Sequence, residues 1–227
     1  MTARLSFCAL ALLLLLAPSA RLGAQSDEAD RVKESSVVLN EIMKASDSAI
    51  PTSVLEKAEG IAVFPGTVRG GFIVGAERGR GILSARDEKT KMWSTPAFLT
   101  ITGGSLGLQI GGQATDIVLV VVNERGIDNL AQNTFKIGGD ASVAAGPVGR
   151  EATASTDYKL QAQILSYSRS RGLFAGVSLA GSTIRADRDA NEKIYGVGYS
   201  TRNIVIERKV EPTTAAGPWL KVLKDRM

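Results

Sequence analysis

The chain has 227 residues, of which 44% are hydrophobic and 22% are charged, and its formal net charge is +4 at pH 7. It contains no histidine, and its one cysteine is Cys8. These absences exclude histidine-based catalysis, and beyond Cys8 they exclude disulfides, thiol nucleophiles and thiolate metal sites. The charge is too small for the concentrated positive field of a nucleic-acid binder. Because no catalytic pair of carboxylates stands out either, we predict one domain with a proper core, no enzymatic activity, no cofactor and no metal.

The first 24 residues have the pattern of a secretory signal peptide. A short basic start that ends at Arg4 precedes the apolar run Leu5–Ala17, and small residues follow up to Ala24. We predict cleavage after Ala24, export, and a periplasmic or secreted location that is peripheral to a membrane. The alternative is an uncleaved anchor, although the apolar run is short for a membrane span of about 20 residues. Cleavage would remove Arg4 and Arg21 and no acid, so the net charge of +4 would fall to +2.

An amphipathic helix is predicted from Asp27 to Ala45. Apolar and small side chains recur there at steps of three and four, and charged side chains fall largely on the other side. Two interpretations stay open: a helix docked on the core of its own domain, or a helix whose apolar face meets a membrane surface. Pro51 suits the first turn of a second helix, Thr52–Glu59, which Gly60 ends.

From Ile61 onward the sequence has the texture of short, glycine-punctuated strands. We predict a strand at 61–64 that Pro65 and Gly66 stop, a strand at 69–76, a turn at 77–79 and a returning strand at 80–85. The run IVLVVV within residues 115–123 is typical of a strand buried on both faces. Further strands are predicted at residues 92–101, 135–138, 158–169, 173–184 and 203–210, and short helices at residues 124–132 and 187–195.

The stretch from Gly138 to Arg150 consists almost entirely of small residues. Val143 and Val148 recur among them, which favours a tightly bent strand pressed against its neighbours over a flexible linker. Runs of strands beside helices gathered at the start predict an α+β fold: an antiparallel, strongly curved, glycine-rich β-sheet or barrel-like core with N-terminal helices packed on it. Residues 25–211 would form this single domain, and residues 212–227 a C-terminal tail.

Basic side chains gather around the predicted turn at residues 77–79. Arg78 and Arg80 would project from it, and Arg86, Lys89 and Lys91 lie on the next loop, diluted by acids. One interpretation is an ordinary solvated surface. The functional interpretation is a basic rim that contacts phosphates on a lipid-facing surface.

Several segments in one order resemble the SYLF-domain family, which is also described as the actin-binding domain of certain yeast endocytic proteins. The resemblance runs from about Pro51 to Tyr195. Its segments are KAEGIAVFP at 57–65, GGF at 70–72, GLQIGG at 107–112, DIVLVVVN at 116–123, residues 138–150, YSRSRGLFAGVSL at 167–179, and AN and YG at 190–191 and 195–196. Each segment alone would be weak evidence, whereas all of them in order make the match specific.

The resemblance implies a lipid-binding module. Eukaryotic relatives bind phosphoinositides, largely through an N-terminal amphipathic helix, some bind actin, and exported bacterial relatives resemble phospholipid binders. The matching helix here is Asp27–Ala45, with Lys33 and Lys44 as candidate headgroup contacts. Many relatives have an acid where Ala180 stands, so any role of that position would be absent here. We expect an exported, bacterial-type member, for which the resemblance gives no basis for actin binding.

The function predicted from the sequence is non-enzymatic phospholipid binding by an exported protein. The N-terminal helix and the basic rim, with Lys33, Lys44, Arg78 and Arg80 as candidate lipid-binding residues, would meet anionic membrane surfaces. The alternative is a small outer-membrane β-barrel, which a signal peptide, glycine-rich strands and a lack of cysteine would also suit. The apolar run at residues 117–122 argues against it, because a lipid-facing barrel strand should alternate.

Overall fold

The structure of the chain is a computed structural model, and it describes residues 20–44, 50–71, 74–106, 113–138, 143–148, 162–170 and 173–227. Its helices are α1 (Ala20–Lys44), α2 (Thr52–Glu56), α3 (Glu124–Leu130), α5 (Arg188–Tyr195), α6 (Thr201–Val205), the 3-10 helix η1 (Thr214–Ala216) and α7 (Gly217–Arg226). Its strands are β1 (Gly60–Gly71), β2 (Val74–Ala85), β3 (Ala97–Leu106), β4 (Gln113–Val121), β5 (Thr134–Lys136), β6 (Val143–Ala145), β7 (Ile164–Ser170), β8 (Leu173–Gly176) and β9 (Thr183–Ala186).

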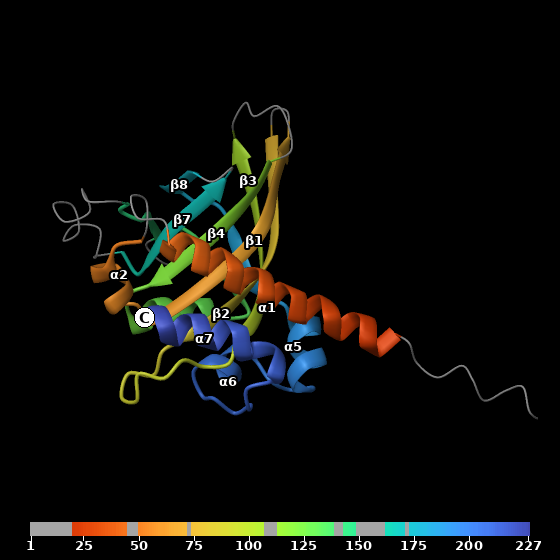
Figure 1. Ribbon diagram of the computed structural model, residues 1–227. Coiled ribbons are helices and arrows are strands. Elements are labelled where there is room, and N and C mark those ends of the chain that lie inside the picture. The colour runs from red at the N-terminus through yellow and green to blue at the C-terminus, as the bar shows by residue number, and fades with distance from the viewer. Residues whose placement is uncertain are drawn as a thin grey trace, which may run out of the picture.

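The described strands form one sheet that curls strongly into a half-barrel (Figure 1). Their order is β5-β9-β3-β2-β1-β4-β7-β6, and β8 also pairs with β7. All pairings are antiparallel except that of β6 with β7, which is parallel. The predicted α+β class, with a strongly curved, mostly antiparallel sheet and an N-terminal helix packed on it, is confirmed.

Both faces of the sheet carry a hydrophobic core, and β4 contributes to each. Val118 and Val120 point to the face that α1, α2 and α7 cover, where they join Leu39 and Trp219. The alternate residues Ile117, Leu119 and Val121 point to the concave face, which α3 and α6 help to close. Every residue from Ile117 to Val121 is fully buried, which confirms the predicted strand buried on both faces.

Helix α1 is docked on the sheet by its apolar side. Val32, Leu39 and Ile42 are at most 2% exposed, so the interpretation as a core helix is the one that the structure shows. The helix begins at Ala20 and therefore runs across the predicted cleavage position after Ala24. Among the described helices, none is both long and apolar enough to cross a lipid bilayer.

Two predictions about the first hairpin are wrong. Pro65 and Gly66 do not stop the first strand, because β1 continues past them through an irregularity at which Gly66 has a φ of 54°. Residues 77–79 are not a turn but lie inside β2, and the pairing of Gly71 with Gly75 places the hairpin connection earlier in the chain. Residues 72–73 themselves lie outside the described part of the chain.

The C-terminal part also differs from its prediction. The expected strand at residues 203–210 is absent: residues 203–205 belong to the helix α6, which begins with a capping box between Ser200 and Asn203, and residues 206–210 are irregular. Residues 212–227, predicted as a tail, contain η1 and α7. Helix α7 lies beside α1 (Figure 1), and its Trp219 is fully buried and donates from Nε1 to Ser84 Oγ at 2.8 Å.

The small-residue stretch 138–150 is described only in part. Within it the structure contains the short strand β6, which is consistent with a strand pressed against neighbours. Gly146 follows, and a Cβ atom there would collide with the ring of Tyr167, which explains why glycine is needed at this close approach. Residues 139–142 and 149–150, and the first four residues, 158–161, of the predicted strand 158–169, lie outside the described residues.

The burial of Trp219 gives a test of whether the last helix belongs to the domain. Trp219→Phe is expected to lower the free energy of unfolding by about 1–3 kcal/mol, because the buried Ser84 hydroxyl would lose its donor. Urea unfolding followed by circular dichroism measures this loss. Lys221→Ala, at an exposed position of the same helix, should change the free energy by less than about 0.5 kcal/mol. Equal stability of both variants and the parent chain would contradict the expected role of α7.

Candidate functional site

The four predicted site residues lie on two different elements. Lys33 and Lys44 are exposed on α1, eleven residues apart, which corresponds to about 16 Å along the helix axis. Arg78 and Arg80 are exposed on β2, where they lie on one side of the strand because they are two residues apart. The prediction that they project from a hairpin turn is wrong, since both belong to the sheet.

The exposed side of α1 does not form a basic surface. Between Asp27 and Lys44 the charged residues exposed on it are Asp27, Asp30, Lys33, Glu34, Glu41 and Lys44. Acids therefore outnumber lysines, while the apolar side of the helix faces the core. In the docked state, α1 alone offers little attraction to an anionic surface.

The register of the sheet instead assembles a basic surface from four strands. In one row, Arg78 of β2 pairs with Thr102 of β3, which pairs with Thr183 of β9. Lys136 of β5 completes that row by pairing with Thr183. The next row, two residues along, runs in the same strand order and consists of Arg80, Thr100, Arg185 and Thr134. Residues that are paired directly, or two apart on one strand, share a face of the sheet.

We call these eight residues the basic strip. Its four cations and two of its threonines, Thr102 and Thr134, are exposed, while Thr100 and Thr183 are half-buried. None of the eight is an acid, and within the described residues no salt bridge involves Arg78, Arg80 or Arg185. With strands about 4.8 Å apart, the strip extends about 14 Å across the sheet from β2 to β5. It is therefore a continuous, positively charged patch on a rigid element.

Helix α1 borders the basic strip on the same face of the sheet. Two residues beyond Arg80 on β2 lies Ile82, and two residues before Thr100 on β3 lies Phe98; both are buried in the core under α1. Between the helix and the strip lies a groove of about 590 Å³. Arg78 and Arg80 line it on the sheet side, and acids of α1 line it on the other.

Two ion-pair clusters hold α1 in this position. Near the middle of α1, Arg31 is 5% exposed and donates from Nη1 to Asp187 Oδ2 at 2.8 Å. Its guanidinium carbon lies 5.2 Å from the centre of the Phe98 ring. Burial lowers the pKa of Arg31, and the hydrogen bond to Asp187 opposes this effect. Near the C-terminal half, Arg169 of β7 pairs with both Asp116 of β4 and Glu41 of α1.

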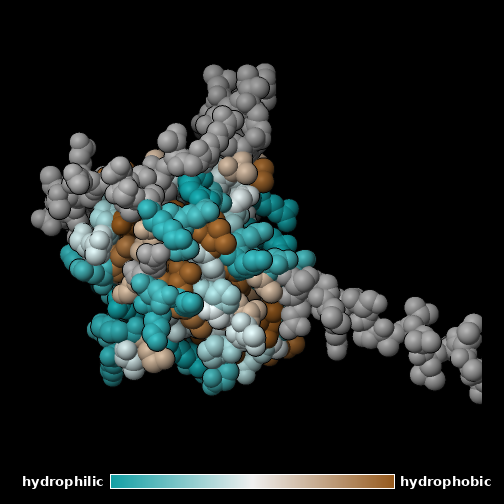
Figure 2. Space-filling model, viewed as in Figure 1, coloured by the Kyte–Doolittle hydropathy of each residue, from teal (hydrophilic) through white to brown (hydrophobic). Residues whose placement is uncertain are grey.

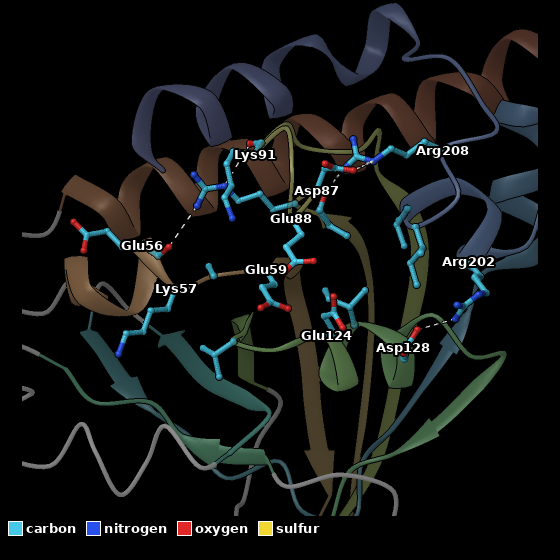
Figure 3. A pocket seen from close by; sticks show the side chains of 17 residues that line it. Glu56, Lys57, Glu59, Asp87, Glu88, Lys91, Glu124, Asp128, Arg202 and Arg208 are labelled. Atoms are coloured by element: carbon cyan, nitrogen blue, oxygen red, sulfur yellow. Dashed lines mark hydrogen bonds and ion pairs between the residues drawn. The ribbon is translucent and has the colours of Figure 1, made fainter.

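A second hollow lies where α2, α3, α6 and the loop after β2 meet (Figure 3). It has a volume of about 540 Å³, and several of its charges pair with each other, such as Arg202 with Asp128 at 2.7 Å and Arg208 with Asp87 at 3.7 Å. Figure 3 shows Glu59 near its centre. Burial raises the pKa of Glu59, and the nearby Glu124 and Glu88 raise it further. Within the described residues, no cluster of acids could hold a metal ion.

Only part of this arrangement could be predicted from the sequence. Arg78 and Arg80 could be selected from their local charge, whereas Arg185 and Lys136 were not. Neither has a local signal, because each is a single basic residue in a short strand far along the chain. They join Arg80 and Arg78 only through the pairing of β9 with β3 and of β5 with β9.

The raised pKa of Glu59 gives a prediction about stability. A carboxyl group whose folded pKa lies above its unfolded value of about 4.5 binds more protons in the folded state, so the stability decreases as the pH rises through that interval. Glu59→Gln removes this penalty and is expected to raise the midpoint of urea unfolding at pH 7 but not at pH 3. Glu56→Gln, at an exposed position of the same hollow, should leave both midpoints unchanged. An equal effect of Glu59→Gln at the two pH values would contradict the prediction.

Comparison with known proteins gives an independent finding. A family model named Ysc84 and described as "Las17-binding protein actin regulator" matches residues 102–226, which is more than half of the chain. Protein YSC84 of Saccharomyces cerevisiae is 35% identical over 208 residues, which cover 90% of this chain and 44% of that protein. The SH3 domain-containing YSC84-like protein 1 of Homo sapiens is 37% identical over 150 residues, which cover 66% of this chain and 43% of the human protein.

The matched region extends to the last helix, beyond the segment on which the sequence resemblance rests. It includes α7 as well as β5 and β9 of the basic strip. The chain spans less than half the length of the yeast and human relatives named above. Because these relatives are eukaryotic, they lend no support to the expectation of an exported, bacterial-type member. The chain belongs to the Ysc84 family, whose shared domain is the SYLF domain.

Proposed function

We propose that the chain is a non-enzymatic module that associates with anionic phospholipid surfaces through the basic strip. The observation that carries this proposal is the register of β2, β3, β9 and β5, which puts four cations and no acid on one exposed part of the sheet. Figure 2 shows that hydrophilic and hydrophobic residues are interspersed on the face it presents, so no single broad apolar patch dominates that view. Charge is therefore the better basis for attraction to a membrane.

The size of the charge effect is sufficient for reversible binding. A lysine or arginine near an anionic bilayer contributes about 1 kcal/mol, so four of them together contribute about 4 kcal/mol before screening. At physiological ionic strength, salt screens such attraction over a Debye length of about 8 Å, so charges farther than this from the membrane contribute little. The strip would thus give weak, salt-sensitive association that avidity or a second contact can strengthen.

Helix α1 would assist through Lys33 and Lys44 at its exposed side. Its apolar side cannot enter a membrane while it stays docked, because Val32, Leu39 and Ile42 are part of the core. For the same reason, deleting α1 would remove core residues, so a truncated chain would not test lipid binding alone. Point substitutions of exposed cations are the informative experiment.

The strip predicts a large loss of binding on charge removal. The triple variant Arg78→Gln, Arg80→Gln, Arg185→Gln in the full chain is expected to bind vesicles of phosphatidylcholine and phosphatidylglycerol about a hundredfold more weakly, because about 3 kcal/mol of attraction is lost. Vesicle co-sedimentation measures this affinity at low and at high salt.

Two control variants accompany this measurement. Lys89→Gln, Arg125→Gln, Lys221→Gln removes the same number of exposed charges elsewhere and should bind almost as well as the parent chain. Lys33→Gln, Lys44→Gln isolates the contribution of α1. If the folded parent chain does not bind anionic vesicles, the proposal is wrong, and a protein partner, as in the Las17-binding description of the family, becomes the better candidate.

We also propose that the chain is exported, as the pattern of residues 1–24 suggests. Expression in a bacterial host followed by mass spectrometry of the periplasmic fraction is expected to give a product that begins at Gln25. Leu13→Arg and Leu14→Arg, which interrupt the apolar run, should keep the chain in the cytoplasm with its N-terminus intact. A full-length cytoplasmic product from the unaltered chain would contradict the proposal.

A further inference from the structure

The groove between α1 and the basic strip has walls of opposite charge. Asp27, Asp30 and Glu34 line it from the helix, and Arg78 and Arg80 line it from β2. All five side chains are exposed, and within the described residues no ion pair joins the two walls. Opposite charges therefore face the same hollow without neutralising each other directly.

The fold keeps the two walls apart. Arg31 also lines the groove, but it is 5% exposed and is already engaged by the half-buried Asp187, so this ion pair fixes α1 at its distance from the sheet. The irregularity of β1 at Pro65 and Gly66 contributes a further part of the lining. The groove is thus a standing feature of the docked helix, and its volume of about 590 Å³ lies in the range of small-molecule sites.

We propose that this groove binds a zwitterionic headgroup made of a phosphate and a primary ammonium, as in phosphatidylethanolamine. The phosphate would accept hydrogen bonds from Arg78 and Arg80, for which a guanidinium is well suited. The ammonium would donate to the carboxylates of Asp30 and Glu34. This inference rests on the proposed function, because Arg78 and Arg80 belong to the basic strip and a bilayer lying on the strip would place headgroups at the mouth of the groove.

The proposal distinguishes two lipids with the same net charge. The quaternary ammonium of phosphatidylcholine has no N–H, so it cannot donate to a carboxylate, whereas phosphatidylethanolamine can. A purely electrostatic strip would not prefer either of them. The acids of α1, which would only repel a surface of phosphatidylglycerol, become ligands when an ammonium is present.

The experiment is co-sedimentation of the full chain with four kinds of vesicle. These contain phosphatidylcholine alone, or with phosphatidylglycerol, with phosphatidylethanolamine, or with both. The increase in binding when phosphatidylglycerol is added (the phosphatidylglycerol effect) tests the proposed function. The further increase when phosphatidylethanolamine is added at constant phosphatidylglycerol (the phosphatidylethanolamine effect) tests the groove. We expect phosphatidylethanolamine to strengthen binding about threefold to tenfold, the range of a few exposed charge-assisted hydrogen bonds.

Asp30→Asn, Glu34→Gln is the decisive variant, because both positions are exposed and the fold does not depend on them. It is expected to abolish the phosphatidylethanolamine effect and to retain the phosphatidylglycerol effect. Glu211→Gln, an exposed acid that does not line the groove, should change neither effect. If Asp30→Asn, Glu34→Gln strengthens binding equally with and without phosphatidylethanolamine, the acids only repel the membrane and the inference is wrong.

A soluble probe separates a lipid from a free metabolite. O-Phosphoethanolamine carries the same phosphate and ammonium, and in excess it is expected to remove the phosphatidylethanolamine effect without displacing the chain from phosphatidylglycerol. Calorimetry of the chain with this probe should show weak binding, since only the bilayer also engages the rest of the strip. Tight binding of the free probe would assign the groove to a soluble ligand and overturn the lipid assignment.

Discussion

The packing of α1 across the curled sheet is the constraint on which the rest of the structure depends. Its apolar side chains complete one of the two cores, and the ion pairs of Arg31 with Asp187 and of Glu41 with Arg169 fix it near its middle and near its C-terminal end. A buried cation such as Arg31 needs its partner, because an unpaired charge in that position costs several kcal/mol. The position of the helix therefore decides which part of the sheet face is core and which part remains open as the basic strip and the groove.

The candidate site follows from pairing between strands that are far apart in the sequence. Arg80 and Arg185 face the same side of the sheet only because β3 lies between β2 and β9 and pairs with both. A sheet holds such side chains at fixed spacing, so the cations need little ordering when they meet a surface. Loops could gather the same charges only at a larger cost in conformational entropy.

The sequence was sufficient to predict the helices and strands whose pattern of residues is local. The β-branched run of β4, the amphipathic pattern of α1 and the helix α5 that begins after Asp187 all lie close to where they were predicted. The wrong secondary-structure predictions arise where a glycine or a capping residue is compatible with two different local structures. Gly79 suggested a turn, but it lies inside β2, where a Cβ atom on it would collide with the side chain of Thr67 of β1.

The remaining errors have two origins, one in a local capping motif and one in non-local packing. The apolar residues after Ser200 have the composition of a strand, yet the capping box selects a helix over them. Residues 212–227 have too small an apolar face to predict docking, and the full burial of Ala216, Trp219 and Leu223 explains why they pack. Of the site, the sequence predicted the two arginines of β2, while Arg185 and Lys136 required knowledge of the strand order.

The contact between α1 and α7 joins the first described helix to the last described one. During synthesis, the apolar face of α1 leaves the ribosome early, whereas α7, which lies against it, emerges only after all the described strands of the sheet. Over that whole interval the nascent chain carries an amphipathic helix without all of its partners, in a form that chaperones or a nearby bilayer can bind. The folded protein conceals this face, so the same segment that stabilises the finished domain is an exposed apolar surface while the domain is being made.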